Sequence, residues 1–276
     1  MAMNAFTVDL EEWFHICGVG GALAADNWDA LPSRVEMTTR WLLDELDTAG
    51  VRATWFVLGW VAERHPRLIE DVHRAGHVIG SHGYSHTRVY ELTPAAFDAE
   101  LTRSRRTLAG IVPQPVTAFR APEWSLNTRV PWGFDGLRAA GFTLDASMAP
   151  LKIVGQVDYP RVPHRRPAGD GTIVEVPPFV ADRYGHVMPM GWGWGLRMSS
   201  PARVAREITR ANQAGRPAVL TVHPWEIDPQ PPRTRLPARQ HFAHYFRIHG
   251  FARRLREILR LVPFTSLDEV AAAAKQ

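Results

Sequence analysis

The sequence predicts an α/β protein in which parallel strands are covered by helices, as either an open sheet or a TIM-like barrel. Apolar, β-branched runs of strand length alternate with segments of helical periodicity along the chain. Its 276 residues suit one large domain, and no glycine–serine linker, repeat or charge block divides them. Polar residues follow several of the apolar runs, and in such folds the chemistry gathers where strands end.

In the first half, expected strands alternate with expected helices. Thr93-Pro94 supplies a cap and a first-turn proline for the third of these helices. The strands are predicted at residues 5–10, 53–58, 77–80, 116–119 and 142–144, and the helices at 33–48, 66–75, 94–109 and 130–140.

Residues 146–200 interrupt this rhythm because they are rich in Pro, Gly and Trp. We expect an elaborated loop region near a binding site there, with one strand at 172–176. The pattern resumes with helices at 201–214 and about 240–261, strands at 218–222 and 262–265, and a last helix that starts at a capping box of Ser266 and Glu269.

Composition limits the function classes. The single cysteine, Cys17, excludes an internal disulfide and a cysteine-based zinc site, so a metal would need His and carboxylate ligands. Basic residues concentrate at 161–166 and 233–260, where an anionic glycan, nucleic acid or an anionic membrane surface could bind. Because basic and acidic residues are mixed along most of the expected helices, we favour a solvated surface that binds no nucleic acid. The sequence lacks a secretion signal and an 18-residue apolar stretch, which predicts a cytoplasmic protein with at most peripheral membrane contact.

Two carboxylates lie at the end of the first expected strand. Strand alternation places Asp9 and Glu11 on one face, whereas Phe6, Val8 and Leu10 share the other. Buried carboxylates need a partner, and metal coordination or proton transfer would provide one. The alternative is a strand that simply emerges into solvent.

Two histidines follow the third strand. His82 and His86 have the i, i+4 spacing that lets two imidazoles reach one ion. His73 and His77 have the same spacing without a nearby carboxylate, so the spacing alone is weak evidence. The first pair gains weight from its position and from the carboxylates of the first strand.

Three further polar residues lie at strand ends. Arg120 needs an anionic partner if it is buried, and Asp9 is the natural candidate. Asp145 and His223 could form an acid and the carboxylate that orients it.

Together, these strand-end clusters resemble the polysaccharide deacetylase family, also called the NodB-homology or family 4 carbohydrate esterases, and within it the branch associated with exopolysaccharide loci. The resemblance extends over nearly the whole chain. It implies a distorted TIM-like (β/α)7 barrel that forms one catalytic domain over residues 1–276. It also implies one divalent metal, usually zinc, with cobalt, nickel or manganese as other possibilities. The implied reaction is hydrolysis of N-acetyl groups on amino sugars. The implied partner is an acetylated amino-sugar polymer or a lipid-linked oligosaccharide.

Carried over by this resemblance, Asp9 is the base, Arg120 its partner, His82 and His86 are metal ligands, and His223 is the acid. Asp145 matches the carboxylate that orients this acid, and a backbone N–H near Glu123 matches an oxyanion stabiliser. The first motif departs from the commonest pattern, since Leu10 occupies the place of a metal-binding Asp. Alternation favours Glu11 over Glu12 as the replacement ligand.

Four tryptophans in loop motifs are candidates for stacking on sugar rings. They could instead close the barrel mouth. These residues are Trp124, Trp192, Trp194 and Trp225.

Two other functions stay open. A metal-dependent amidohydrolase acting on a small cyclic amide or imide would suit the altered first motif. A non-catalytic glycan-binding protein with a decayed site is the second, although Asp9, Arg120 and His223 together argue against it.

Overall fold

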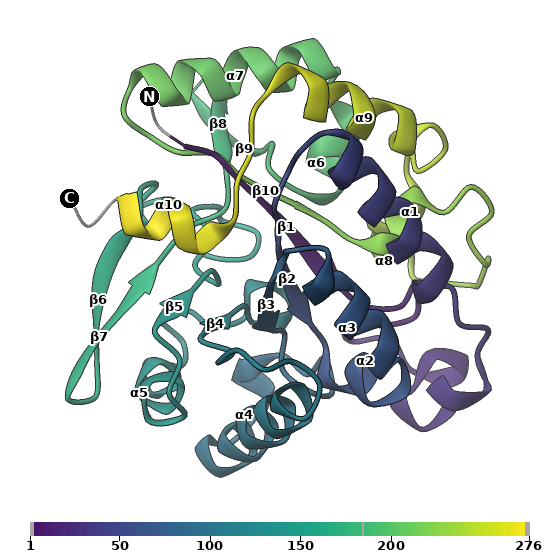
Figure 1. Cartoon of the computed structure of the whole chain (residues 1–276), viewed down its shortest axis with the longest axis vertical. Coiled ribbons are helices and arrows are strands. Elements are labelled where there is room, and N and C mark those ends of the chain that lie inside the picture. Colours follow the sequence, from purple (N-terminus) through teal and green to yellow (C-terminus); the bar gives the residue numbers. More distant parts are fainter. Residues whose placement is uncertain (1–2, 184, 274–276) are drawn as a thin grey trace.

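The structure is a computed structural model that describes residues 3–183 and 185–273. Its main sheet curls into a half-barrel in the strand order β10-β1-β2-β3-β4-β5-β7-β6 (Figure 1). All pairs are parallel except the pair of β7 and β6, so the described residues supply seven parallel strands and one antiparallel edge strand. The strands are β1 (Ala5–Leu10), β2 (Thr54–Val57), β3 (Val78–Ser81), β4 (Ala118–Phe119), β5 (Leu144–Asp145), β6 (His164–Ala168), β7 (Gly171–Glu175) and β10 (Val219–Val222).

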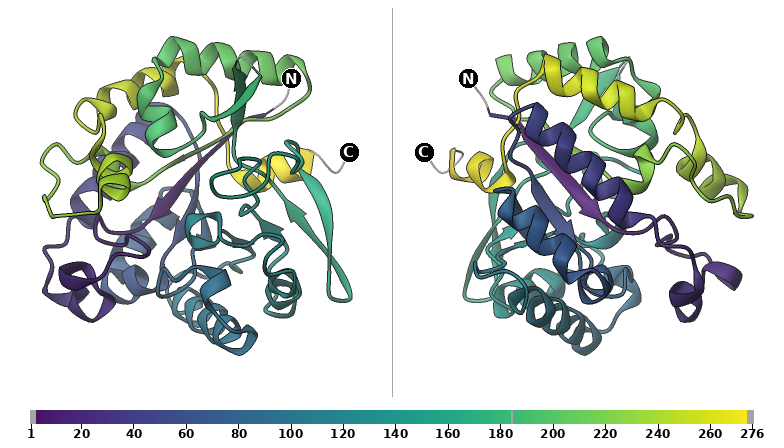
Figure 2. Two further views of the ribbon diagram at one scale, coloured as in Figure 1. Left: turned by 180° about the vertical axis from the view of Figure 1, so that it is seen from behind. Right: turned by 45° about the vertical axis from the view of Figure 1, so that its right-hand side comes forward.

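Most of the helices cover the outside of this curled sheet (Figures 1 and 2). Two of them begin as their sequences predict: Thr93 Oγ1 accepts a hydrogen bond from Ala96 N, and Ser200 Oγ accepts one from Arg203 N, each followed by proline. The helices are α1 (Val35–Thr48), α2 (Gly59–Arg64), α3 (Pro66–Arg74), α4 (Pro94–Ala109), α5 (Trp132–Ala139), α6 (Gly193–Met198), α7 (Pro201–Gln213), α8 (Ala238–Tyr245), α9 (Phe251–Leu261) and α10 (Leu267–Ala273). No described helix is long and apolar enough to cross a membrane.

Side chains alternate between the two faces of β1. Phe6, Val8 and Leu10 belong to the large core between the sheet and its outer helices. Ala5 belongs to a smaller inner cluster with Phe56 and with residues of α10. Thr7 and Asp9 therefore share the inner face with Ala5, as the sequence pattern predicts.

Two regions differ from the expected elements. The basic segment 240–261 is not one helix, because the chain breaks between α8 and α9, where Arg247 and Gly250 have φ of 51° and 77°. Glycine adopts this left-handed backbone without strain. The region 146–200 is rich in loops, as expected, but it contains two hairpins and α6 in place of the one expected strand. Its second hairpin pairs β8 (Val180–Arg183) with β9 (His186–Pro189).

The predicted strand at 262–265 is reduced to a single bridge between Ala5 and Thr265. The short helix α2 was not expected from the sequence, since β2 leads into it through Leu58 with no side-chain cap.

Candidate active site

Asp9 is held by a buried arginine. Arg120 Nη1 lies 2.7 Å from Asp9 Oδ1, and neither side chain is more than 3% exposed. The guanidinium also donates to the Thr7 hydroxyl and to the Ala146 carbonyl, at 2.9 Å and 3.1 Å, and lies over the ring of Phe56. These contacts fix the orientation of Arg120, so the predicted pairing of Arg120 with Asp9 is confirmed.

Glu11, His82 and His86 form a cluster of the kind that holds a metal ion. Their ligand atoms all lie within 4.8 Å of one another, and all three side chains are buried. Glu11 Oε2 is 2.6 Å from His86 Nε2 and 3.9 Å from His82 Nε2. The sequence prediction that these three residues come together is therefore confirmed.

The far nitrogen of each imidazole has its own partner. His82 Nδ1 lies 2.8 Å from the Arg120 carbonyl, which can only accept, so His82 carries its hydrogen there. His86 Nδ1 lies 3.3 Å from Cys17 Sγ, and this thiol donates to the His86 carbonyl. Both Nε2 atoms are thereby left to face Glu11, as in metal sites where outer partners orient the histidines.

The charges of this cluster also fit a divalent cation. Burial lowers the pKa of His82 to about 4, so its imidazole is neutral at pH 7, as a metal ligand must be. Burial would raise the pKa of Glu11, but His86, His223 and His82 outweigh it and keep the carboxylate ionised. Burial opposes a charged His86, but Glu11 and Cys17 raise its pKa well above the ordinary value, so His86 and Glu11 form an ion pair in the metal-free site. A bound metal would replace that proton, and one anionic oxygen with two neutral nitrogens would then leave coordination positions open for water and substrate.

Glu12 faces the opposite side of the chain from Glu11. Its carboxylate accepts hydrogen bonds from the Ser33 hydroxyl and from the backbone N–H groups of Arg34 and Val35, at the start of α1. An acidic side chain in this position stabilises a helix N-terminus. Glu12 therefore stabilises α1, and Glu11 is the carboxylate that lies at the histidine pair.

His223 follows β10 and faces Asp9 across the site. Its Nε2 lies 3.8 Å from Asp9 Oδ2 and 3.9 Å from Glu11 Oε1. Its Nδ1 lies 2.9 Å from Glu226 Oε2, an oxygen that also accepts from the His223 backbone N–H. Burial opposes the charged imidazole, but Glu226, followed by Glu11 and Asp9, raises the pKa of His223 to about 9. His223 is therefore protonated at pH 7 and can act as an acid.

The predicted role of Asp145 as the orienting carboxylate is wrong. Leu144 and Ala146 belong to the inner apolar cluster, so alternation turns Asp145 to the other face of the sheet. There Asp145 accepts from the Ser147 hydroxyl at 2.6 Å and shares a hydrogen bond with the carboxyl of Glu175. Glu226, not Asp145, is the carboxylate that contacts His223 Nδ1.

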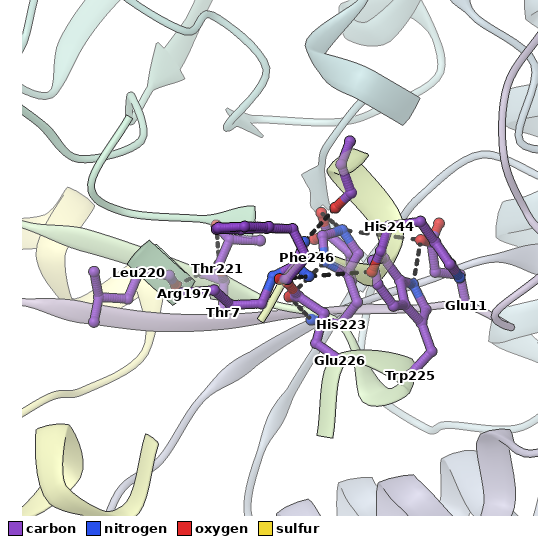
Figure 3. Close-up of polar contacts among 12 residues, drawn as sticks. Thr7, Glu11, Arg197, Leu220, Thr221, His223, Trp225, Glu226, His244 and Phe246 are labelled. Atoms are coloured by element: carbon purple, nitrogen blue, oxygen red, sulfur yellow. Dashed lines mark hydrogen bonds and ion pairs between the residues drawn. The ribbon is translucent and has the colours of Figure 1, made fainter. Parts of the chain in front are cut away.

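Glu226 is in turn paired with a buried arginine. Arg197 Nε lies 3.0 Å from Glu226 Oε1, and both side chains are fully buried. The guanidinium also donates to the backbone carbonyls of Ala243, His244 and Phe246 at the C-terminal end of α8 (Figure 3). Arg197 thus ties α6, the turn after β10 and α8 together behind the histidine.

Trp225 contacts the carboxylate of Glu11. Its indole N–H donates to Glu11 Oε1 at 3.0 Å (Figure 3). Its ring stacks on both His223 and His244, with centroid distances of 5.1 Å and 4.1 Å. The structure therefore gives Trp225 a positioning contact that the sequence did not suggest, and sugar stacking by this residue stays a prediction.

The other predicted substrate-binding residues line the site. Trp124 and Trp192 contact each other with ring centroids 4.7 Å apart. Together with Trp194 they line a cavity of about 220 Å³. The same cavity is lined by Asp9, Glu11, His82, His86 and His223. Glu123 lines the same cavity and forms an ion pair of 2.7 Å with Arg88. Glu123 and Trp124 have φ of 49° and 52°, a strained backbone of the kind found at functional sites.

Sequence reasoning missed several residues of this site. Glu226 had a visible signal, since it follows His223 by three residues in the motif Leu220-Thr-Val-His-Pro-Trp-Glu226. His15 accepts a hydrogen bond from the Glu12 backbone N–H, lines the cavity and also lies near the first-strand carboxylates in sequence. Thr7 had a signal in strand alternation, which places it on the same face as Asp9. Arg197, His244 and Cys17 had no sequence signal, because tertiary contacts bring them to the site.

Two family models match adjoining parts of the chain. Residues 23–144 match the family described as polysaccharide deacetylase. Residues 146–272 match a domain of unknown function, DUF3473, which contains His223, Glu226 and Arg197.

Curated relatives match shorter segments. A peptidoglycan-N-acetylglucosamine deacetylase of Bacillus cereus is 33% identical over 76 residues, which make up 26% of this chain and 28% of the relative. A chitin deacetylase of a Pestalotiopsis species is 33% identical over 89 residues, or 31% of this chain and 30% of the relative. The matches span about a third of the length of these relatives, and they support the polysaccharide deacetylase family.

Solved structures share the fold. A Mycobacterium smegmatis protein provisionally assigned as a polysaccharide deacetylase has a TM-score of 0.63 at 23% identity, covering 100% of this chain and 91% of that one. A family 4 carbohydrate esterase pseudoenzyme from Bacillus anthracis has a TM-score of 0.53 at 13% identity, covering 98% and 65% of the two chains. The predicted TIM-like α/β architecture of this family is therefore confirmed.

Proposed function

We propose that this protein is a metal-dependent hydrolase that removes N-acetyl groups from amino sugars of a polysaccharide or of its lipid-linked precursor. One observation carries the proposal. A carboxylate held by arginine, a Glu–His–His cluster and a protonated histidine face one another in a single cavity, with His223 Nε2 3.8 Å from Asp9 Oδ2. Simple glycan binding does not require such an arrangement of acid and base.

Asp9 is the general base in this proposal. It accepts a proton from the water that attacks the acetamide carbon, while the ion pair with Arg120 holds the carboxylate in its orientation. A divalent metal held by Glu11, His82 and His86, most often zinc in this family, would supply Lewis acidity that activates the water and polarises the carbonyl. The backbone N–H at Glu123 is the proposed second stabiliser of the oxyanion.

His223 is the general acid. It gives its Nε2 proton to the amine nitrogen as the carbon–nitrogen bond breaks, which releases acetate and a free amino sugar. Glu226 orients the imidazole through Nδ1 and keeps its pKa high, so the proton is available at neutral pH. The proposal predicts that activity is bell-shaped in pH, with Asp9 required ionised and His223 required protonated.

Acetate release from N-acetylglucosamine oligomers by the zinc-loaded protein tests this function. We expect release that disappears in Asp9→Asn, whereas ring opening of a cyclic imide without acetate release would favour the amidohydrolase alternative. Stoichiometric metal without hydrolysis of either substrate class would instead indicate a glycan-binding protein with a decayed site. A cytoplasmic location and an exopolysaccharide-locus association stay predictions from the sequence.

A further inference from the structure

A second and larger cavity adjoins the catalytic one. Its volume is about 710 Å³, within the range of roughly 300–1,000 Å³ that is usual for ligand pockets. The two cavities share four lining residues: Glu123, Trp194, Gln240 and Ala243. A ligand whose acetamido group lies at Asp9 and Glu11 can therefore continue into this second space without leaving the protein.

The second cavity is strongly basic, and we name it the basic cavity. Its lining contains four cations, Arg88, Arg129, Lys152 and Arg239, but only one carboxylate, Glu123, for a formal charge of +3. The whole chain carries only +4, so the positive charge of this lining is out of proportion to its size. Glu123 is already paired with Arg88.

The other three cations lack an anionic partner. Among the residues that the structure describes, no carboxylate oxygen lies within 4.0 Å of the charged groups of Arg129, Lys152 or Arg239. The Arg129 guanidinium lies 4.1 Å from the ring centroid of Tyr90, which orients it without neutralising it. These charges come from three segments distant in sequence, so the charge is gathered by the fold rather than by one basic run.

The rest of the lining suits a carbohydrate. Trp194 and Phe242 contribute aromatic rings, which can pack against sugar rings. Amide and hydroxyl groups complete it, from Asn127, Thr128, Gln156, Tyr159 and Gln240.

We propose that the basic cavity binds an anionic group, a carboxylate or a phosphate, carried by the same substrate whose acetamido group enters the catalytic cavity. This inference rests on the proposed function, because it takes that acetamido group as the reference point. The substrate is then an acidic glycan, with a uronate next to the acetylated sugar, or a sugar diphosphate linked to a carrier. A neutral chitin-like chain would leave three unpaired cations in contact with it.

Kinetics on three substrates test the proposal. They are a neutral N-acetylglucosamine oligosaccharide, an oligosaccharide of equal length that alternates N-acetylglucosamine with glucuronate, and an N-acetylglucosaminyl diphosphate with a short alkyl chain. We expect kcat/KM to be higher for at least one charged substrate, and salt to reduce this preference. Preference for the glucuronate substrate identifies a carboxylate as the ligand, and preference for the diphosphate identifies a carrier-linked sugar.

Arg129, Lys152 and Arg239 are exposed, so each ion pair with the substrate should contribute only a few-fold to kcat/KM. The triple variant Arg129→Gln/Lys152→Gln/Arg239→Gln should therefore lower the charged-to-neutral ratio of kcat/KM about 10-fold. Arg260→Gln, an exposed arginine of α9 outside both cavities, is the matched control and should keep the wild-type ratio. Equal ratios in the wild type and the triple variant would overturn the proposal.

Calorimetric binding separates this proposal from the proposed function. The glucuronate oligosaccharide should bind Asp9→Asn protein more tightly than the neutral one, and the triple variant in the Asp9→Asn background should lose this difference. If the wild type hydrolyses none of the three substrates but this binding difference is present, the proposed function fails and the anion site stands. If acetate is released but the binding difference is absent, the anion site fails and the function stands.

Discussion

Residues up to 144 provide Asp9, Glu11, His82, His86 and Arg120 at the ends of neighbouring parallel strands, where register and alternation determine which side chains meet. Residues 146–272 provide His223 from β10 but hold it through Glu226, Arg197 and the end of α8. The first set depends on strand geometry and the second on packing between short elements. The acid half of the site should therefore be easier to perturb through residues that never touch substrate.

The largest effect should come from the base in the strand-built half. Asp9→Asn removes the proton acceptor but keeps the shape, so kcat should fall about 10²–10⁴-fold while bound metal is retained. Acetate release and metal content measured on the same preparation check this, with the exposed Asp170→Asn as the control. Near-normal kcat with full metal content would remove Asp9 from the mechanism.

Arg197→Met should be the most destabilising change in the other half. It leaves the Glu226 carboxylate buried with one partner fewer, and breaking a buried pair typically costs about 3–5 kcal/mol. Urea denaturation measures this loss in the free energy of unfolding. Arg40→Met removes only exposed ion pairs and should cost less than about 1 kcal/mol. Equal losses for the two variants would contradict a structural role for Arg197.

The pH profile distinguishes Glu226 from Asp145. His223 must be protonated to act as an acid, so activity should decline as pH rises through its pKa of about 9. Glu226→Gln removes the charge that raises this pKa, so the alkaline limb should move about one to two pH units lower. Asp145→Asn should leave the limb in place. The opposite pattern would restore Asp145 as the orienting residue.

The raised pKa of His223 also stabilises the folded protein at pH values where this histidine is protonated. The fold favours protonated His223, so this contribution is complete below the ordinary pKa of 6.5 and is lost as pH rises toward 9. The free energy of unfolding of Glu226→Gln should therefore depend less on pH between 6.5 and 9 than that of the wild type.

Trp225→Phe should have the smallest effect. It keeps an aromatic ring between the histidines but removes the N–H that bonds to Glu11, so metal affinity should fall about 10-fold, as for other outer partners of metal ligands. Competition with a metal chelator measures the change. Trp132→Phe on α5 replaces an indole outside both cavities and should leave the affinity unchanged.

Sequence reasoning succeeded where one physical rule determines the outcome. Alternation along β1 predicts that Asp9 and Glu11 face inward, and the end of β3 places His82 beside them. The order of strands and helices in the first half follows from hydrophobic periodicity in the same way. Thr93-Pro94 and Ser200-Pro201 mark helix starts correctly because their caps are local interactions.

Sequence reasoning failed where packing between distant segments determines which side chains meet. The alternation that identified Asp9 also turns Asp145 away from the site, but the position of β5 relative to the core was needed to see this. Arg197 meets Glu226 only because α6 packs beside the turn after β10, which no periodicity encodes. The break between α8 and α9 had a local signal in Gly250, but the amphipathic pattern of 240–261 outweighed it.

The central claim is that the first strand separates its carboxylates by role, with Asp9 as base, Glu11 as metal ligand and Glu12 as the group that stabilises α1. The metal content of purified Glu11→Gln and Glu12→Gln, each checked for folding by circular dichroism, tests this most directly. We predict that Glu11→Gln loses stoichiometric metal, whereas Glu12→Gln retains it and shows only a lower free energy of unfolding. Loss of metal in Glu12→Gln together with full metal in Glu11→Gln would contradict the account.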